Sequence, residues 1–128
     1  MVTRLRLALE HTPQVVGEAR RDAGEAVRSA WPALVGLEDL VDDVRLVTSE
    51  LVGNAVRHGE PPVTFEVLLD DTDGRHRVVL TCHDGGPWDG SDPSPGSGRG
   101  LVIVRALCTA LVIDADATRT TVVATLER

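Results

Sequence analysis

Three polar side chains spaced four residues apart mark the stretch of this sequence best suited to chemistry. Glu50, Asn54 and His58 lie in the segment LVTSELVGNAVRHG and share one face if that segment is helical. An Asn oxygen can complete the coordination shell of a magnesium ion that bridges phosphate oxygens, and a neighbouring carboxylate can take a proton from an attacking hydroxyl. The spacing therefore suits a nucleotide site, although an ordinary partly exposed helical pair has the same spacing.

An aspartate and two glycines follow a predicted strand later in the chain. Asp84, Gly85 and Gly86 stand in the sequence HDGGPW. A carboxylate in this place can accept the exocyclic amino hydrogens of adenine, and glycines let the backbone approach the base closely. A plain Asp-Gly turn needs the same residues, so both interpretations stay open on this tripeptide alone.

A second glycine group, GSGRGL at residues 96–101, precedes a predicted helix. Backbone amides in such a loop and at a helix N-terminus bind anions, and Arg99 adds positive charge. The group is a candidate phosphate cradle, with a flexible linker as the alternative. Because it follows a long loop instead of a strand and lacks the spaced third glycine, a dinucleotide-binding fingerprint is disfavoured.

Composition excludes several classes of function. The formal net charge of −7 argues against tracking a nucleic-acid backbone. All 13 basic residues are arginine, which excludes a phosphate-binding lysine and Schiff-base chemistry. The scattered histidines disfavour a metalloenzyme, and Cys82 and Cys108 lie far apart in apolar contexts typical of reduced, buried thiols. With no apolar run of membrane-spanning length and no signal-peptide pattern, we expect a cytoplasmic location.

The candidate side chains must be positioned by elements in the order strand, helix, helix, strand, strand, glycine-rich loop, helix, strand, strand. This order predicts an α+β two-layer sandwich, a mostly antiparallel mixed sheet with helices on one face, and the 128 residues are expected to form one domain. The expected strands are 2–10, 63–69, 77–82, 111–114 and 120–126, and the expected helices are 13–30, 38–58 and 101–109.

Together, Glu-x-x-x-Asn on a helix, Asp-x-Gly after a strand and Gly-x-Gly before a helix resemble the GHKL (Bergerat-fold) ATPases, the superfamily of DNA gyrase B, MutL and the sensor histidine kinases. The segment SELVGNAVRHG is particularly similar to the anti-sigma-factor serine kinases and their stand-alone actinobacterial relatives. The resemblance covers nearly the whole chain and implies a Bergerat ATP-binding fold over residues 1–128. It also implies a homodimer and two protein partners, a sigma factor held inactive and a small antagonist protein that is phosphorylated.

The same resemblance implies roles for individual residues, with ATP and Mg2+ as cofactors. Asn54 would ligate magnesium, Glu50 would be the general base, and Asp84 would read adenine. The other nucleotide-binding positions that it implies are Gly86 beneath the base, Gly98, Arg99 and Gly100 at the phosphate-side lid and helix entry, and Thr121 near the adenine.

One departure from the family pattern stands beside Asp84. Trp88 occupies the place where the usual Asp-x-Gly-x-Gly box has its last glycine, so we expect the base-side loop either to be shaped differently or to be packed by that indole. The lid between Trp88 and Gly96 is also short and contains proline. Two functions therefore stay open: a serine/threonine protein kinase that uses Mg-ATP, and a partner-binding module without catalysis, responsive to nucleotide or free of it. In neither case do we expect nucleic acid or membrane as a partner.

Overall fold

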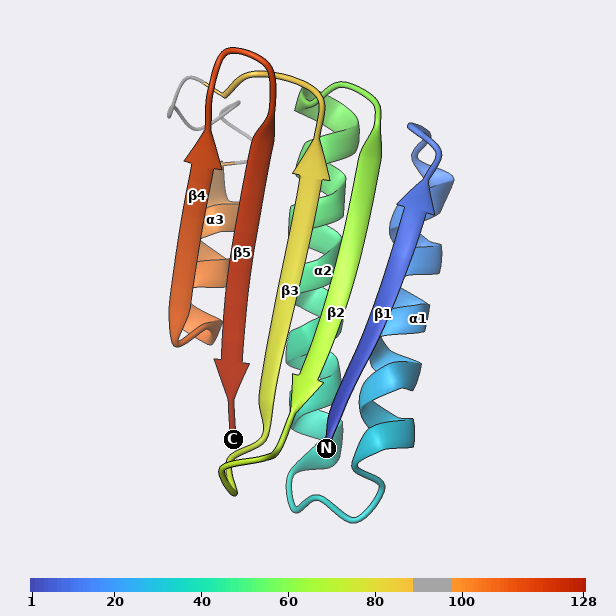
Figure 1. The fold of residues 1–128 in the computed structure, drawn as a ribbon, viewed down its shortest axis with the longest axis vertical. Coiled ribbons are helices and arrows are strands. Elements are labelled where there is room, and N and C mark those ends of the chain that lie inside the picture. Colours follow the sequence, from blue (N-terminus) through green and yellow to red (C-terminus); the bar gives the residue numbers. More distant parts are fainter. Residues whose placement is uncertain (89–97) are drawn as a thin grey trace.

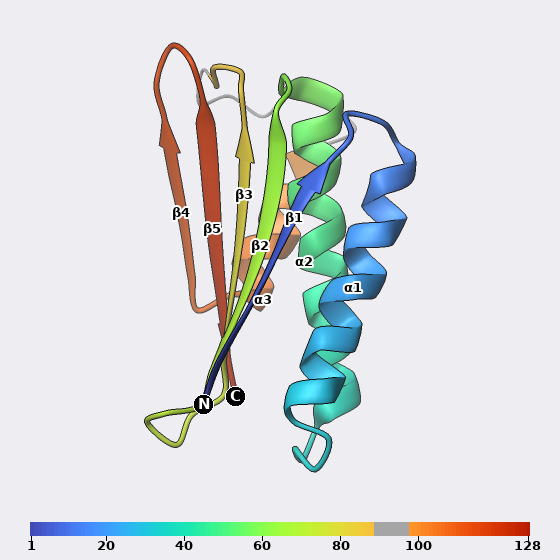
Figure 2. The same ribbon diagram turned by 45° about the vertical axis from the view of Figure 1, so that its right-hand side comes forward.

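A five-stranded sheet covered on one face by three helices forms the architecture of the chain (Figures 1 and 2). The structure is a computed structural model that describes residues 1–88 and 98–128. Its elements are β1 (Val2–Leu9), α1 (Gln14–Ala30), α2 (Leu37–His58), β2 (Val63–Asp70), β3 (Arg77–Asp84), α3 (Gly98–Leu107), β4 (Ala110–Ala115) and β5 (Thr120–Glu127).

The sheet has the strand order β1-β2-β3-β5-β4, and each neighbouring pair is antiparallel. The predicted α+β two-layer sandwich with helices on one face is confirmed. Where the sequence predicted a mixed sheet, the pairing of the described strands is antiparallel throughout. Each observed strand or helix overlaps its predicted range, with ends that differ by up to three residues.

The core lies between the sheet and the helices because alternate strand residues point toward the helices. Phe65 on β2, Leu80 on β3 and Leu126 on β5 are completely buried in this layer. Val44 and Val47 of α2 fill it from the other side and are equally inaccessible. Burial of this apolar surface is the main force that holds the two layers together.

Helix α2 is the element that positions the candidate side chains. Its N-terminus follows Gly36, whose φ of 80° is left-handed and favours glycine. Acidic Glu38 and Asp39 stand in its first turn and a basic pair stands in its last, the favourable arrangement for the helix dipole. Figure 1 shows α2 behind β2 and β3, with α3 behind β4 and β5. α2 packs beside α3, and Glu50 on its polar face lies against Gly100 at the start of that helix.

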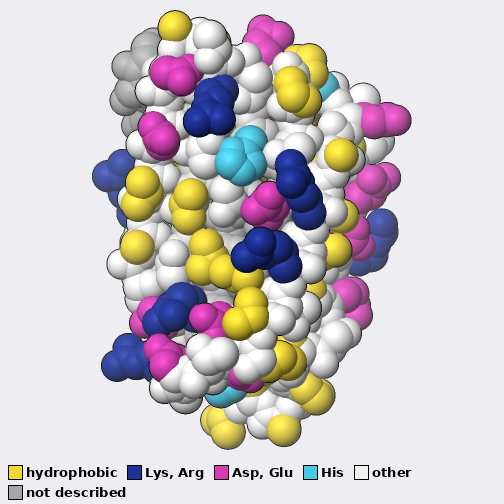
Figure 3. Space-filling view, in the orientation of Figure 1, with side chains coloured by type: hydrophobic (Ala, Val, Ile, Leu, Met, Phe, Trp, Pro, Cys, Tyr) yellow, Lys and Arg dark blue, Asp and Glu magenta, His cyan; other side chains and the backbone are white. Residues whose placement is uncertain are grey.

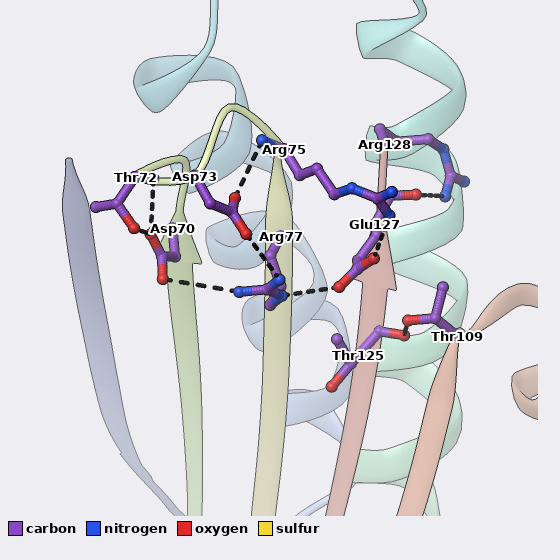
Figure 4. Close-up of polar contacts among 9 residues, drawn as sticks. All are labelled: Asp70, Thr72, Asp73, Arg75, Arg77, Thr109, Thr125, Glu127 and Arg128. Atoms are coloured by element: carbon purple, nitrogen blue, oxygen red, sulfur yellow. Dashed lines mark hydrogen bonds and ion pairs between the residues drawn. The ribbon is translucent and has the colours of Figure 1, made fainter.

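At the end of the molecule near both termini, the turn between β2 and β3 is bound to β5 by ion pairs; we call this region the hairpin end (Figure 4). Arg77 Nε lies 2.8 Å from Glu127 Oε1, and its Nη2 lies 3.3 Å from Asp73 Oδ2. The hydrogen bond from Arg77 lowers the pKa of Glu127, and the backbone amide of Arg75 lowers the pKa of Asp73. Beneath this cluster, Trp31 Nε1 donates to Asp71 Oδ2 at 3.0 Å.

The described helices leave the other face of the sheet uncovered, and Figure 3 shows this face. Apolar side chains gather over its middle, between charged ones. The register pairs Leu68 with Val79 and Val123 with Val112 on this face. None of the helices in the described part of the chain is long and apolar enough to cross a membrane.

Candidate functional site

A pocket open to solvent lies between the C-terminal half of α2, the end of β3, the start of β5 and the start of α3. It brings together Asn54 and Asp84, two predicted site residues that lie far apart in the sequence. Most of the lining is apolar, with a few polar groups, as is typical of small-molecule sites. Its lining residues are Leu51, Asn54, Ala55, His58, Gly59, Cys82, Asp84, Pro87, Trp88, Leu101, Thr120 and Val122.

Asp84 is the last residue of β3 and lies against the end of α2. A Cβ at Gly59 would lie 2.7 Å from Asp84 Oδ1, so this close approach requires glycine. The carboxylate is half-buried, and this burial raises the pKa of Asp84, opposed by hydrogen bonds from the amides of Gly86 and Glu60. A partly desolvated acceptor of this kind suits a ligand that donates hydrogen bonds, such as an exocyclic amino group.

Hydrogen bonds hold the turn after Asp84 to the segment that follows α2 and to β5. Gly86 N donates to Asp84 Oδ1 at 2.8 Å, and Gly85 N donates to the carbonyl of Glu60 at 2.6 Å. From β5, Thr120 Oγ1 donates to the carbonyl of Gly86 at 2.9 Å. Gly86 is itself buried and lies beside Asp84, and its implied place beneath the base stays a prediction.

Thr121 does not lie in this pocket. Its Oγ1 is 2.8 Å from His83 Nδ1, and the two residues are register partners on the face of the sheet away from the helices. Because successive strand residues point to opposite faces, Thr121 points away from the pocket that Thr120 lines, and its implied place near the adenine stays a prediction. The residue of this pair that lines the pocket is Thr120. It stands four residues before buried Ala124, so strand alternation puts both side chains on the face toward the helices, and this alternation could have identified Thr120.

Asn54 is partly exposed and makes a hydrogen bond within α2. Arg57 Nη2 donates to Asn54 Oδ1 at 3.1 Å, so the guanidinium lies beside the carboxamide. Sequence analysis did not select Arg57, although its spacing of three residues from Asn54 puts the two side chains on one helical face. In a chain without lysine, Arg57 is a cation placed directly beside the candidate metal ligand.

Glu50 lies one turn earlier on α2 and is not part of the pocket lining. Its carboxylate lies against Gly100, where a Cβ would collide with it. Gly98 and Gly100 belong to the first turn of α3, so Glu50 places negative charge at the N-terminus of that helix, a favourable position. The side chain predicted at Arg99, like the lid residues 89–97, lies outside the described part of the chain.

A magnesium ion would depend on oxygen atoms that the described residues do not supply. Among the described residues, no group of three or more His, Cys, Asp or Glu side chains could hold a metal. A single oxygen ligand from Asn54 is consistent with the usual coordination of Mg2+, which keeps several waters and binds phosphate oxygens together with few protein ligands. The donor set therefore fits a metal that arrives with a phosphate-bearing ligand.

The two cysteines are thiols with little tendency to ionise. Burial, reinforced by the charge of Asp84, raises the pKa of Cys82 to about 12. Burial also raises the pKa of Cys108 to about 11. Cys82 therefore contributes to the pocket as a small apolar side chain, because a thiol with so high a pKa forms little thiolate at neutral pH.

Comparison with known proteins agrees with this arrangement. Residues 9–126 match the sequence family described as the histidine kinase-like ATPase domain. No curated protein matches the chain significantly.

Solved structures resemble the fold. One contains the RsbU and RsbW domains of Rv1364c from Mycobacterium tuberculosis, with a TM-score of 0.73 and 24% identity over 98% of this chain. Another is the histidine kinase domain of a blue-light activated histidine kinase from Erythrobacter litoralis, with a TM-score of 0.52 and 18% identity over 94% of this chain. The chain covers 33% of the first protein chain and 65% of the second.

Proposed function

Because the chain belongs to the histidine kinase-like ATPase domain family, we propose that it binds Mg-ATP in the pocket between α2, β3 and β5 and acts on a protein partner. The partner reaction is phosphorylation of a serine or threonine on a small antagonist protein. This antagonist would otherwise release a sigma factor that the protein, as a homodimer, holds inactive. The anti-sigma assignment rests on the similarity of the α2 segment SELVGNAVRHG to that branch of the superfamily.

One observation carries the proposal: Asn54 and Asp84 face the same pocket from different elements. In the proposed complex Asp84 accepts hydrogens from the amino group of the base, and Gly86 lies beneath the ring. The Thr120 hydroxyl holds the turn in place through the Gly86 carbonyl. The amides of the first turn of α3, at Gly98 and Gly100, are available for phosphate oxygens.

The phosphate side of the site is assigned to Asn54, Arg57 and Glu50. Asn54 contributes an oxygen to Mg2+, which supplies neutralisation of phosphate charge when bound. Arg57, next to it, adds positive charge that a lysine provides in other nucleotide sites. Glu50 takes the proton of the attacking hydroxyl, from a serine of the partner or from water, and its position against Gly100 keeps it beside the helix that would face the phosphates.

A second function is favoured by a different observation. Glu50 contacts Gly100 and does not line the pocket, and the Asn54 oxygen already accepts from Arg57. A pocket arranged in this way can bind nucleotide without turning it over. The protein would then be a nucleotide-responsive module that sequesters its partner without chemistry, or a nucleotide-free one.

Calorimetric titration with ATP, with and without magnesium, tests the proposal on the wild type and on Asp84→Asn. The proposed function predicts saturable binding that requires magnesium and weakens in the variant. An absence of binding at millimolar ATP would instead assign the fold to partner binding alone. Phosphate transfer from radiolabelled ATP to co-purified partner then separates the kinase from the module without catalysis.

A further inference from the structure

Trp88 is an aromatic side chain placed differently from the other two in the chain. The sequence contains two tryptophans, one phenylalanine and no tyrosine. Phe65 is completely buried in the core, and Trp31 is 4% exposed at the hairpin end. Trp88 is partly exposed and lines the pocket together with Asp84 and Asn54. The chain therefore directs a large apolar ring at the site where the family pattern has a glycine.

The backbone that carries Trp88 is held in place. Gly85 N donates to the Glu60 carbonyl at 2.6 Å, and Thr120 Oγ1 donates to the Gly86 carbonyl at 2.9 Å. These bonds tie the turn to two different segments, the connection after α2 and the strand β5. A ring attached two residues beyond such an anchored turn has little freedom to leave the pocket, so little entropy is lost when it contacts a ligand.

The rest of the pocket completes an apolar slot for a flat ring system. Leu51, Ala55 and Cys82 are at most 4% exposed and form its floor with Val122 and Leu101. Asp84 supplies a hydrogen-bond acceptor at the edge of this apolar surface. An aromatic heterocycle with an exocyclic amino group satisfies both features, because its faces are apolar and its edge donates hydrogen bonds.

We propose that Trp88 is a specificity-determining residue that packs against the base and selects a purine over a pyrimidine nucleotide. The inference rests on the proposed nucleotide binding. Adenine and cytosine both carry an exocyclic amino group that Asp84 can recognise, so this carboxylate alone discriminates poorly between them. The larger purine ring gains more contact with an indole, and contact between a base and an aromatic side chain is commonly lost with about a tenfold drop in affinity.

Calorimetric titration of ATP and CTP, each with magnesium, tests this assignment on the wild type, Trp88→Ala and Trp88→Phe. We expect Trp88→Ala to weaken ATP binding about tenfold or more and CTP binding less, so that the ratio of the two affinities falls. Trp88→Phe should restore most of the ratio. A role confined to holding the turn would weaken both nucleotides equally and leave the ratio unchanged, which would contradict the proposal.

A second measurement uses the tryptophan emission directly. In Trp31→Phe the indole of Trp88 is the remaining tryptophan fluorophore, and ATP should change its emission with the midpoint found by calorimetry. Unchanged emission at saturation, or Trp88→Ala binding ATP as tightly as the wild type, would overturn the inference. If the wild type binds neither nucleotide, the proposed function itself fails. If the wild type binds and Asp84→Asn weakens that binding while the Trp88 variants do not, only this inference fails.

Discussion

Carboxylates at the two ends of the sheet have pKa values shifted in opposite directions. At the hairpin end, hydrogen bonds and neighbouring arginines lower the pKa of Asp73 and Glu127, so the charged forms are favoured. At the pocket, burial raises the pKa of Asp84, so its charged form is disfavoured. The contrast indicates that charge at the hairpin end stabilises the fold. The charged form of Asp84 does not stabilise the fold in this way, as is frequent for groups in functional sites.

The difference follows from the partners of each group. Arg77 lies between Asp73 and Glu127 at the hairpin end. Among the described side chains, none forms an ion pair with Asp84, and its carboxylate accepts hydrogen bonds from the backbone amides of Gly86 and Glu60. The two regions can therefore be tested separately, because substitutions at one end should change stability and those at the other should change binding or transfer.

The largest effect is expected on phosphate transfer when Glu50 is changed, with only a small loss of stability because its charge at the N-terminus of α3 is removed. Glu50→Gln should lower phosphate transfer by about 10² to 10⁴-fold, because a general base is removed while size and shape are kept. ATP affinity should stay the same or rise, since a negative charge near the phosphates is lost. Transfer assays with labelled ATP alongside calorimetry measure both, and unchanged transfer in Glu50→Gln would remove the assigned role.

Asp84→Asn should weaken ATP binding by about 10 to 100-fold, because an amide is a poorer acceptor than a carboxylate and a hydrogen bond to a charged group is lost. The free energy of unfolding should not fall, since no ion pair from a described side chain is broken and a desolvated charge is removed. Calorimetry and urea titration give the two quantities. A loss of stability as large as the loss of binding would mean that Asp84 belongs with the structural carboxylates.

Thr120→Val and Thr121→Val form a matched pair on opposite faces of β5. Thr120→Val removes the hydrogen bond to the Gly86 carbonyl and should weaken ATP binding by about five to tenfold. Thr121→Val loses its contact with His83 on the far face and should leave affinity unchanged. Equal losses in both variants would show that the hydroxyls act through general stability, which thermal unfolding would reveal.

At the hairpin end, Arg77→Gln should lower the melting temperature by a few degrees and leave ATP affinity unchanged. Its side chain is 31% exposed and contacts several carboxylates, whereas the Arg75 side chain is 70% exposed and pairs with Glu127 at 3.3 Å. Arg75→Gln is therefore the control and should have a smaller effect. Added salt should shrink the difference between the two variants, because it screens exposed pairs.

The smallest effect is in the pH dependence of stability. Asp73 and Glu127 have lowered pKa values in the folded state, so their contribution is present above the unfolded pKa and is lost as the pH falls through the folded value. Asp84 has a raised pKa, so its unfavourable contribution fades as the pH falls through that value. Urea unfolding between about pH 3 and pH 7 should show Arg77→Gln with a shallower acid loss than the wild type, and Asp84→Asn with a steeper one.

Much of the architecture could be predicted because its signals are local. The spacing of Glu50 and Asn54 placed both on one helix, and the position of Asp84 at the end of a strand was close to correct. Thr121 shows the limit of local sequence signals. A choice between neighbouring residues requires the register of β5 against β3, because a shift of one residue puts a side chain on the opposite face of the sheet.

Contacts between side chains on different elements could not be read from the sequence. The contact of Glu50 with Gly100 depends on how closely α3 packs beside α2, which no single segment specifies. The hydrogen bond from Arg57 to Asn54 depends on a long, flexible side chain choosing one rotamer among many. The sequence suggested candidate residues for the site, and the packing determines which of them meet.

The order of the strands has a consequence for how the chain folds. The β2–β3 and β4–β5 pairs join segments close in sequence, but β3 and β5 are connected through α3 and must meet across a long intervening stretch. Closing such a loop costs conformational entropy before its contacts form, so we expect this pairing to come late on the folding pathway. The pocket spans this seam, with Asp84 on β3 and Thr120 on β5. Binding competence would then be acquired only after both hairpins have formed, and a ligand would retard unfolding by holding the two hairpins together.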